Sequence, residues 1–228
     1  MQAINNASIP TKQVPWYKLT IVLLCVTFLF TQNSYATQSS TKDKPLASDE
    51  LKPLSSKQNS KLEKGVFLVA TKTLDNSPFD KSVIYVTQYG SSGTYGLIVN
   101  RRLPMAVNEV IPEAKQSDDE NNLFFGGPMH ARHLFILTET NEAAGLHPVN
   151  HGIYFGAGPA IVSRLEKSDN QHSIRTYAGF SSWGPGQIEQ EIKSGDWLVI
   201  PANSQQLFNK NPELLWTQLY KNWGGDWI

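Results

Sequence analysis

Short apolar runs separated by turn-forming residues dominate the chain from Gly65 onward. Runs of this kind, rich in Val, Ile, Leu and Phe and bounded by Gly, Pro, Asn or Ser, are typical of β-strands. Several are apolar at every position, which indicates strands that are covered on both faces. The pattern predicts strands over Val66–Ala70, Val83–Thr87, Leu97–Asn100, Leu123–Phe125, Leu134–Thr138, Ile153–Phe155, Ile174–Phe180 and Trp197–Ile200.

Helical patterns occur in four segments between or after these strands. Three of them begin with a proline, which is favoured in the first turn of a helix, and in the last one Leu215, Leu219 and Trp223 repeat at helical spacing. Because helices and strands are interleaved without a regular βαβ order, we expect one α+β (mixed α/β) domain over residues 65–228. The predicted helices are Val107–Ala114, Pro159–Lys167, Pro185–Ser194 and Pro212–Trp223.

The N-terminal segment has a pattern of its own. Two lysines and no acidic residue precede the apolar run Leu19–Phe30, and the small residues of Ser34-Tyr35-Ala36 follow it. The run has the length of the apolar part of a signal peptide and is shorter than the roughly 20 residues of a membrane span. We expect residues 1–36 to be a signal peptide cleaved near Ala36 and the protein to be exported to the periplasm. The alternative is an uncleaved signal anchor, which would tether the domain to the membrane through Leu19–Phe30.

Residues 37–64 are rich in Ser, Lys, Gln, Asp and Pro, with scattered leucines and no sustained period. Such a composition buries too little apolar surface to fold alone and is typical of a flexible linker. We therefore expect a linker between the cleavage site and the domain. The alternative is an extension that docks on the domain through Leu51 and Leu54.

Charge and cysteine content narrow the classes of function. The chain has 20 basic and 20 acidic residues and no basic block, so nucleic acid is not an expected partner. The single cysteine, Cys25, lies in the apolar N-terminal run, so the domain has neither a disulfide nor a thiol nucleophile. The sequence contains no motif that indicates a cofactor, and none is expected.

The stretch Gly179–Trp197, GFSSWGPGQIEQEIKSGDW, is the most particular part of the chain. We expect Pro185 to occupy the first helical turn, Gly195 to end the helix, and the two tryptophans to clamp the helix to the sheet. These roles are structural, and a catalytic role for Glu189 or Glu191 is the alternative. The predicted structural signature comprises Trp183, Gly184, Gly186, Gln187, Glu189 and Trp197.

One serine lies in a setting that matches part of a hydrolase motif. Gly179-Phe-Ser181 begins like a nucleophile elbow, but the elbow needs glycine two residues after the serine, and Trp183 stands there. No Asp and His follow in a suggestive order. A hydrolase-type enzyme therefore remains an alternative function, and no catalytic residue is predicted.

Two histidine pairs have the spacing of metal ligands. His130-x-x-His133 and His147-x-x-x-His151 would bring their imidazoles together on a helix. Neither pair lies in a helical pattern, since His130 follows Gly-Gly-Pro-Met and His147 precedes a proline. We expect surface histidines and no metal site.

Two clusters at strand ends form the predicted binding site. The first, Asn100-Arg101-Arg102, follows an apolar strand and supplies an amide and two guanidiniums. The second, Gly126-Gly127-Pro128, can form a concave nest of backbone N–H groups for an anion. Sites are commonly built where strands end. The predicted partner is an unidentified protein or a small ligand. The predicted binding residues are Asn100, Arg101, Arg102, Gly126, Gly127 and Pro128.

Several motifs accompany the stretch at residues 179–197 and are jointly specific. They are GVFLVATKTLDNSPFDKSVIYV at 65–86, GTYGLIVNR at 93–101, FFGGPM at 124–129 and FILT at 135–138. Together they resemble the YqgE/AlgH family (UPF0301) over most of the domain. The resemblance implies a mixed α/β fold whose branched β-sheet curls into a partial barrel with a few short helices. It implies no established reaction, ligand or cofactor, and the family is associated with a suggested regulatory role.

The chain departs from the family pattern at three places. Family members usually carry a histidine soon after the second strand, where Gln88 and Tyr89 stand here, and often end the FIL strand with a histidine, where Thr138 stands. Typical members are cytoplasmic and begin near the equivalent of Gly65. An N-terminal export signal therefore indicates a divergent member, and a cytoplasmic regulatory role is not transferred to it.

These observations predict an exported, single-domain, non-enzymatic protein that binds a protein partner or a small ligand. Two alternatives come from other classes. One is a hydrolase-type enzyme that uses Ser181, a histidine or Glu189, and the other is a membrane-tethered scaffold held by Leu19–Phe30. The motifs predict the family and the fold more closely than they predict a biochemical role.

Overall fold

Ten strands form one sheet in the computed structural model, which describes residues 60–112, 114, 122–166 and 173–223. They are β1 (Val66–Ala70), β2 (Val83–Gly90), β3 (Gly93–Ile98), β4 (Arg102–Ala106), β5 (Asn122–Phe125), β6 (Met129–Thr138), β7 (His147–Asn150), β8 (Ile153–Ala157), β9 (Ile174–Trp183) and β10 (Trp197–Pro201). The main order is β10-β1-β2-β3-β9-β6-β8-β7, and β4 pairs with β5 as a side branch. The pairs are antiparallel except that of β5 with β9.

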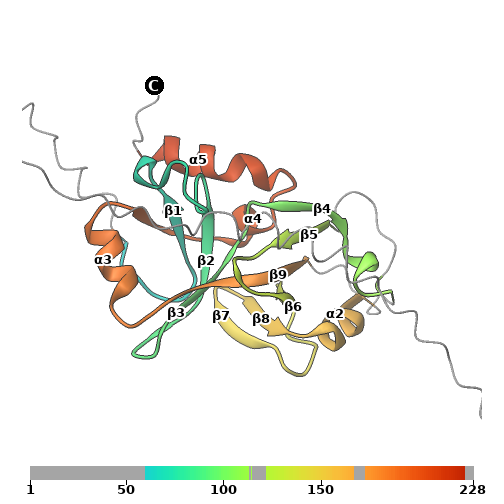
Figure 1. Ribbon diagram of the computed structural model, residues 1–228. Helices are drawn as coiled ribbons and strands as arrows, with labels where there is room; N and C mark the ends of the chain where they lie inside the picture. The colour runs from blue at the N-terminus through green and yellow to red at the C-terminus, as the bar shows by residue number, and fades with distance from the viewer. Residues whose placement is uncertain (1–59, 113, 115–121, 167–172, 224–228) are drawn as a thin grey trace, which may run out of the picture.

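Short helices cover the sheet and its ends. They are α2 (Pro159–Glu166), α3 (Gln187–Lys193), α4 (Ser204–Leu207), α5 (Leu215–Asn222) and the 3₁₀ turns η2 (Lys72–Leu74), η3 (Val107–Glu109) and η4 (Pro212–Leu214). Figure 1 shows α3 on one side of the molecule, α2 on the opposite side, and α5 across the ends of β1 and β2. The indole N–H of Trp216 on α5 donates to the carbonyl of Ala70 (2.7 Å), which fixes α5 to the end of β1.

The sheet branches at β9, which pairs with three other strands. β6 runs along one edge of β9. β5 pairs with residues 177–178 and β3 with residues 181–183 on the other edge. Because β3 and β5 share this edge, they diverge, and the sheet curls into a half-barrel. The predicted α+β class and the predicted branched, curled sheet are confirmed.

Gly126 lies at this branch point without room for a side chain. Its N–H donates to the carbonyl of Ala178 (2.9 Å) and its own carbonyl accepts from the N–H of Ile98 (2.9 Å), so it joins β9 to β3. A Cβ atom on Gly126 would lie 2.2 Å from the carbonyl oxygen of Gly179. Gly179 itself has φ +73°, a left-handed conformation that glycine adopts without strain. The two glycines therefore allow two backbones to cross in close contact.

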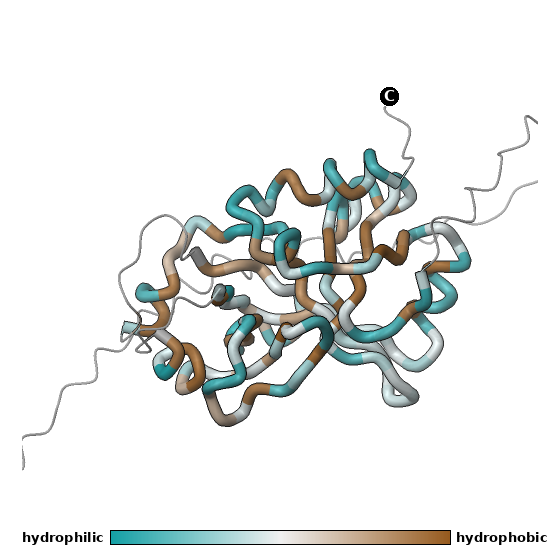
Figure 2. The backbone as a smooth tube through the Cα atoms, turned by 180° about the vertical axis from the view of Figure 1, so that it is seen from behind, coloured by the Kyte–Doolittle hydropathy of each residue, from teal (hydrophilic) through white to brown (hydrophobic). Residues whose placement is uncertain are grey.

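Both faces of the sheet are covered, which explains the continuously apolar strands. Along β1, Phe67 and Val69 belong to the cluster inside the half-barrel, whereas Leu68 and Ala70 belong to an outer cluster that includes Ile188 of α3. A third cluster lies between α2 and the outer face of β6. In Figure 2, hydrophobic segments run along the central strands and hydrophilic ones lie at the peripheral turns.

Two helix predictions need correction, whereas α2 forms as predicted. Of the predicted helix Val107–Ala114, only the first turn forms, as η3, and the prediction is wrong beyond it. Pro112 lacks the N–H that a continuing helix needs. Pro185 does not start α3: the helix begins at Gln187, because Gly186 has φ 76° and turns the chain just before it. The C-terminal helix forms as η4 followed by α5.

Each predicted strand overlaps an observed strand, but β4 and β7 were not predicted. β4 contains Pro104 and β7 contains Pro148, and proline cannot donate the N–H bond of a central strand. Both strands pair on one side only, where this loss is tolerated. β6 also begins earlier than predicted, at Met129.

The predicted signal peptide over residues 1–36 and most of the predicted linker lie outside the described residues. The last part of that linker contacts the domain: the N–H of Ser60 donates to the carbonyl of Val199 (3.4 Å), and half-buried Leu62 packs against the outer cluster. Contacts with the domain thus extend back to Ser60. In the part of the chain that the structure describes, no helix is long and apolar enough to span a membrane.

Replacing Gly126 with alanine should destabilise the domain, because the added methyl group would clash with the carbonyl of Gly179. We expect the free energy of unfolding, measured by urea denaturation, to fall by about 1–3 kcal/mol or more. Gly90→Ala is the matched control, since nothing lies within 4 Å of a Cβ atom at that position. Its effect should stay below about 0.5 kcal/mol. Equal losses in the two variants would contradict the role of Gly126 at the branch point.

Candidate functional site

Four aromatic side chains form a contiguous row inside the half-barrel. Tyr95 on β3, Phe180 on β9, Phe135 on β6 and Phe155 on β8 come from four strands that are consecutive in the sheet. The ring centroids are 5.6 Å apart between Tyr95 and Phe180, 5.4 Å between Phe180 and Phe135, and 5.9 Å between Phe135 and Phe155. Each residue is half-buried, so part of each ring meets solvent. We call these four residues the aromatic row.

The aromatic row lines a groove of about 460 Å³, which we call the mouth groove. The end of β2 and the strand β7 contribute its walls. Lys64, just before β1, donates from Nζ to the carbonyl of Pro148 (3.2 Å) and so joins the start of the domain to β7. None of the lining side chains is acidic. Besides the aromatic row, the lining consists of Lys64, Thr87, Gln88, Tyr89, His147, Pro148 and Val149.

Tyr89 lies on the rim of the mouth groove and links it to α3. Its hydroxyl donates to Oε1 of Glu189 (2.9 Å), and this bond to a carboxylate raises the pKa of Tyr89 above its ordinary value. The side chain remains 38% exposed. At neutral pH the phenol is therefore protonated, and its oxygen and ring face are available to a ligand.

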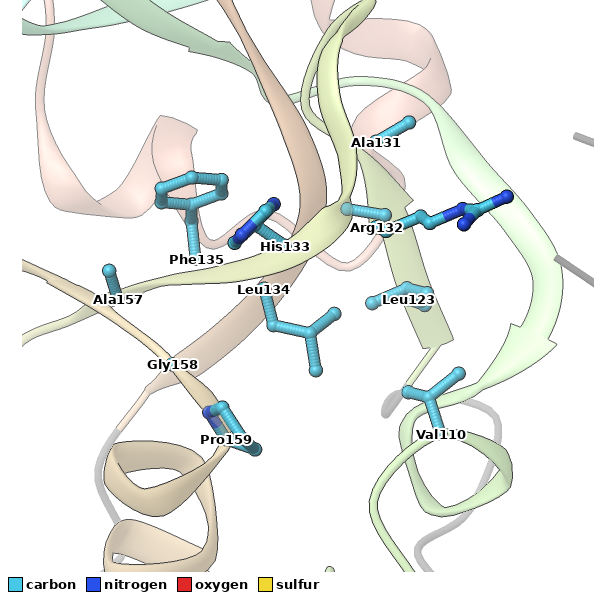
Figure 3. Close-up of a pocket in the computed structure, with 11 residues that line it drawn as sticks. Val110, Leu123, Ala131, Arg132, His133, Leu134, Phe135, Ala157, Gly158 and Pro159 are labelled. Carbon is cyan, nitrogen blue, oxygen red and sulfur yellow. The ribbon is translucent and has the colours of Figure 1, made fainter. Parts of the chain in front are cut away.

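A second groove of about 470 Å³, the outer groove, lies along β6 (Figure 3). In Figure 3, Leu134 points toward Leu123 and Val110, whereas His133 and Phe135 project to the other side of β6. The two grooves share only Phe135. Of the two, the mouth groove combines an aromatic floor with a polar rim, as ligand sites commonly do. It is the better candidate for a binding site.

His130 and His133 are in contact although their segment is a strand. Their ring centroids are 5.2 Å apart and the ring planes are at 77°. His130 also stacks on Phe180, with centroids 5.6 Å apart and planes at 8°. Both histidines are exposed. By contrast, His147 lines the mouth groove, and His151 lies in the turn after β7.

Asn100 and Arg101, two of the predicted binding residues, are bonded within the chain. The buried amide of Asn100 accepts from the N–H of Val83 (2.9 Å) and donates to the carbonyl of Lys81 (2.9 Å). The guanidinium of Arg101 donates to two carbonyls of the loop before β2, at 2.6 and 2.7 Å. Burial lowers the pKa of Arg101, and the nearby carboxylate of Asp80 opposes this shift. Both side chains therefore hold that loop against the end of β3.

Arg102 is the third polar residue of that cluster, and it bonds the same segment of backbone as Arg175. Arg175 is buried, and the sequence patterns did not single it out. Arg102 donates to the carbonyl of Lys210, and Arg175 donates to the carbonyls of Leu207 and Asn209. Burial is the largest influence on Arg175 and lowers its pKa. The two arginines thus secure the chain that leaves α4.

Gly126 and Gly127 lie at the strand crossing, and Pro128 follows them at an exposed position. The N–H of Gly126 is bonded to Ala178, and a Cβ atom on Gly127 would lie 2.3 Å from the carbonyl carbon of Phe180. Pro128 has no N–H to offer. A ligand role for these residues and for the arginine cluster stays a prediction, and the mouth groove is the better-formed site.

Glu191 fastens the signature segment, and it was not among the predicted signature residues. Its Oε2 accepts from the indole N–H groups of Trp183 and Trp197, at 2.9 Å each, and its Oε1 accepts from Nε2 of Gln187 (2.9 Å). Oε1 of Gln187 accepts in turn from the N–H of Gly184 (3.0 Å). The two indoles meet edge to face with centroids 5.9 Å apart. Oε2 of Glu191 thus holds α3 to β9 and β10, and Oε1 forms a bond within α3.

Ser181, the serine of the hydrolase alternative, is buried within β9. Its hydroxyl donates to the carbonyl of Gly126 (3.4 Å). A nucleophile elbow instead holds its serine exposed at a turn between a strand and a helix. The geometry gives no support to Ser181 as a nucleophile.

Comparisons with known proteins place the chain among relatives. The AlgH-like family model matches residues 67–228. A UPF0301 protein of Cytophaga hutchinsonii is 31% identical over 171 residues, which cover 73% of this chain and 92% of that protein. One from Methylococcus capsulatus is 31% identical over 165 residues, covering 70% and 91%. The names of these relatives assign no activity.

Solved structures show the same fold. The solution structure of the AlgH protein from Pseudomonas aeruginosa matches with a TM-score of 0.61 and 21% identity, over 75% of this chain and 94% of that one. A crystal structure of a Corynebacterium diphtheriae protein matches with a TM-score of 0.63 and 24% identity, over 72% and 89%. At these identities the likeness concerns the fold alone.

Glu191→Ala should destabilise the protein because it leaves two indole N–H groups without their acceptor. We expect the free energy of unfolding to fall by about 2–3 kcal/mol, as measured by urea unfolding followed through tryptophan fluorescence. Glu191→Gln should lose less, since it keeps one carbonyl oxygen for the indoles. Glu189→Ala is the control, because Glu189 is exposed, and it should cost far less than Glu191→Ala. The reverse order of losses would contradict the fastening role of Glu191.

Proposed function

The chain belongs to the AlgH-like family, and we propose that this member is a non-catalytic binding protein whose ligand site is the mouth groove. The observation that carries the proposal is the aromatic row. Four rings on four neighbouring strands meet at the open side of a curled sheet and remain partly exposed to solvent. Leaving such a surface wet is unfavourable, and mouths of barrel-like sheets are common ligand sites.

The chemistry of the mouth groove favours a flat aromatic ligand with an anionic or polar substituent. A planar ring can stack on Phe135, Phe155 or Phe180 at the separations that aromatic pairs prefer. At the rim, Lys64 provides a positive charge, and the carboxylate of Glu189 beside Tyr89 accepts the hydrogen bond of the Tyr89 hydroxyl. Tyr89 and Gln88 add polar atoms that can orient the substituent.

A non-catalytic role is supported by where the reactive side chains lie. Ser181 is buried, and Glu191 has both oxygens occupied by hydrogen bonds. Glu189 is exposed and bonded to the hydroxyl of Tyr89. An enzyme built on these groups would need a different arrangement of the signature segment.

We also propose that the protein works outside the cytoplasm. The support is the apolar run Leu19–Phe30 with its flanking lysines and the small residues that end at Ala36. The rival is a domain that stays tethered to the membrane by the same run and acts as a scaffold. Either form presents the same mouth groove.

The binding proposal can be tested with anilinonaphthalene sulfonate, an aromatic anion with a planar naphthalene ring whose fluorescence rises in apolar sites. We expect saturable binding of one probe per folded chain, and Gln88→Trp should weaken it by roughly tenfold or more because the larger ring fills the mouth groove. Val110→Trp is the matched control, because Val110 lines the outer groove on the side to which Leu134 points (Figure 3).

The predicted strand-end site provides a third variant. Arg101→Ala combined with Arg102→Ala should leave probe binding intact if the mouth groove is the site. Loss of binding in this double variant, with Gln88→Trp binding like the unaltered protein, would reject the mouth groove. Urea unfolding of each variant separates lost binding from lost folding.

The localisation proposal is tested by sequencing the N-terminus of the protein recovered from cells. We expect the recovered chain to begin near Thr37 and to appear in the periplasmic fraction. An intact Met1 in the membrane fraction would instead support the tethered scaffold. Replacing Leu23 and Leu24 with arginine is a control, since charges in the apolar run should block export of either form.

A further inference from the structure

We propose that His130 and His133 form a binding site for a divalent transition-metal ion of the zinc and copper class. The proposal is independent of the ligand proposed for the mouth groove. It rests on the contact between two exposed imidazoles, on the backbone irregularity that creates this contact, and on the ring that holds one imidazole in place.

The irregularity in β6 puts the two side chains on the same side. In a regular strand, residues three apart point to opposite faces. Here the pairing of β6 with β9 shifts register between Met129 and Leu134, and His130 has φ 49°. A left-handed conformation is uncommon for a residue other than glycine, and here it accompanies the register shift that brings the two rings together.

The separation of the imidazoles fits a shared ion. With metal–nitrogen bonds of about 2.1 Å and a tetrahedral angle, two imidazoles on one zinc ion place their ring centres about 5 Å apart. The observed centroid distance between His130 and His133 is 5.2 Å. Imidazole nitrogen is a preferred ligand of zinc and copper ions, with copper(II) bound more tightly at a given site.

The surroundings allow an ion to enter and keep one ring oriented. Both histidines are exposed, and the ring of His130 is stacked flat on Phe180. Figure 3 shows Arg132, the residue next to His133, extending away from the side on which His133 projects. The guanidinium therefore does not point into the site.

The site has two protein ligands and open coordination positions. Among the described residues, no group of three or more His, Cys, Asp or Glu side chains is placed to hold a metal ion. Water would complete the coordination of the bound ion, as in sites that exchange ligands and unlike closed structural zinc sites. We therefore expect a dissociable ion that is not required for folding.

The test is to titrate the full chain with zinc chloride and, separately, with copper(II) sulfate. The heat of binding is measured by isothermal titration calorimetry. We expect a site for one ion with copper bound more tightly than zinc. His133→Phe should weaken binding by roughly tenfold or more, because it keeps a ring against His130 but removes a ligand nitrogen. His130→Asn should do the same, and asparagine tolerates the left-handed backbone at this position.

The chain offers matched controls in its other histidine pair. His147→Gln combined with His151→Gln should leave the affinity unchanged, because these residues lie outside the proposed site. Electron paramagnetic resonance of the copper(II) complex of the unaltered chain should show two bound imidazole nitrogens. The proposal is overturned if His133→Phe binds copper like the unaltered chain, or if the spectrum shows a single nitrogen ligand. The spectroscopic result stands even if a variant fails to fold.

Discussion

The close crossing of two backbones at Gly126 and Gly179 is the constraint on which the rest of the structure depends. Only glycine fits there, because any Cβ atom on Gly126 would overlap the carbonyl of Gly179. The crossing lets β3 and β5 share one edge of β9, and a sheet that branches in this way must curl. The curl turns Tyr95, Phe135 and Phe180 toward one another. The mouth groove is thus a consequence of this backbone contact.

The most specific motifs of the chain maintain this architecture. Glu191 joins both indoles of the signature segment and holds α3 on the sheet. Arg101 and Arg175 bond backbone carbonyls of loops that would otherwise need water as a partner. Burial of these charged groups is offset by the hydrogen bonds they donate. Three residues of the aromatic row, Tyr95, Phe135 and Phe180, also lie within the motifs that resemble the family. The same motifs therefore contribute to the architecture and to the mouth groove.

The strands were predictable because side-chain alternation and apolar runs are local properties. Val66–Ala70 was predicted with its observed bounds, since all its positions are apolar and both faces are covered. β7 was missed because its proline and its polar ends resemble a loop, and only its pairing with β8 makes it a strand. The start of α3 was misplaced because the left-handed conformation of Gly186 is set by the turn out of β9.

The sequence by itself determined the family, eight of the ten strands and the fold class, because these follow from patterns among residues that are close along the chain. It also pointed to a structural role for the signature segment. Only the tertiary structure decided which side chains line the mouth groove. The floor of the mouth groove comes from four strands, and the contact between His130 and His133 depends on the register shift against β9. Such contacts arise from pairing between distant segments, and no local pattern specifies which side chains that pairing brings together.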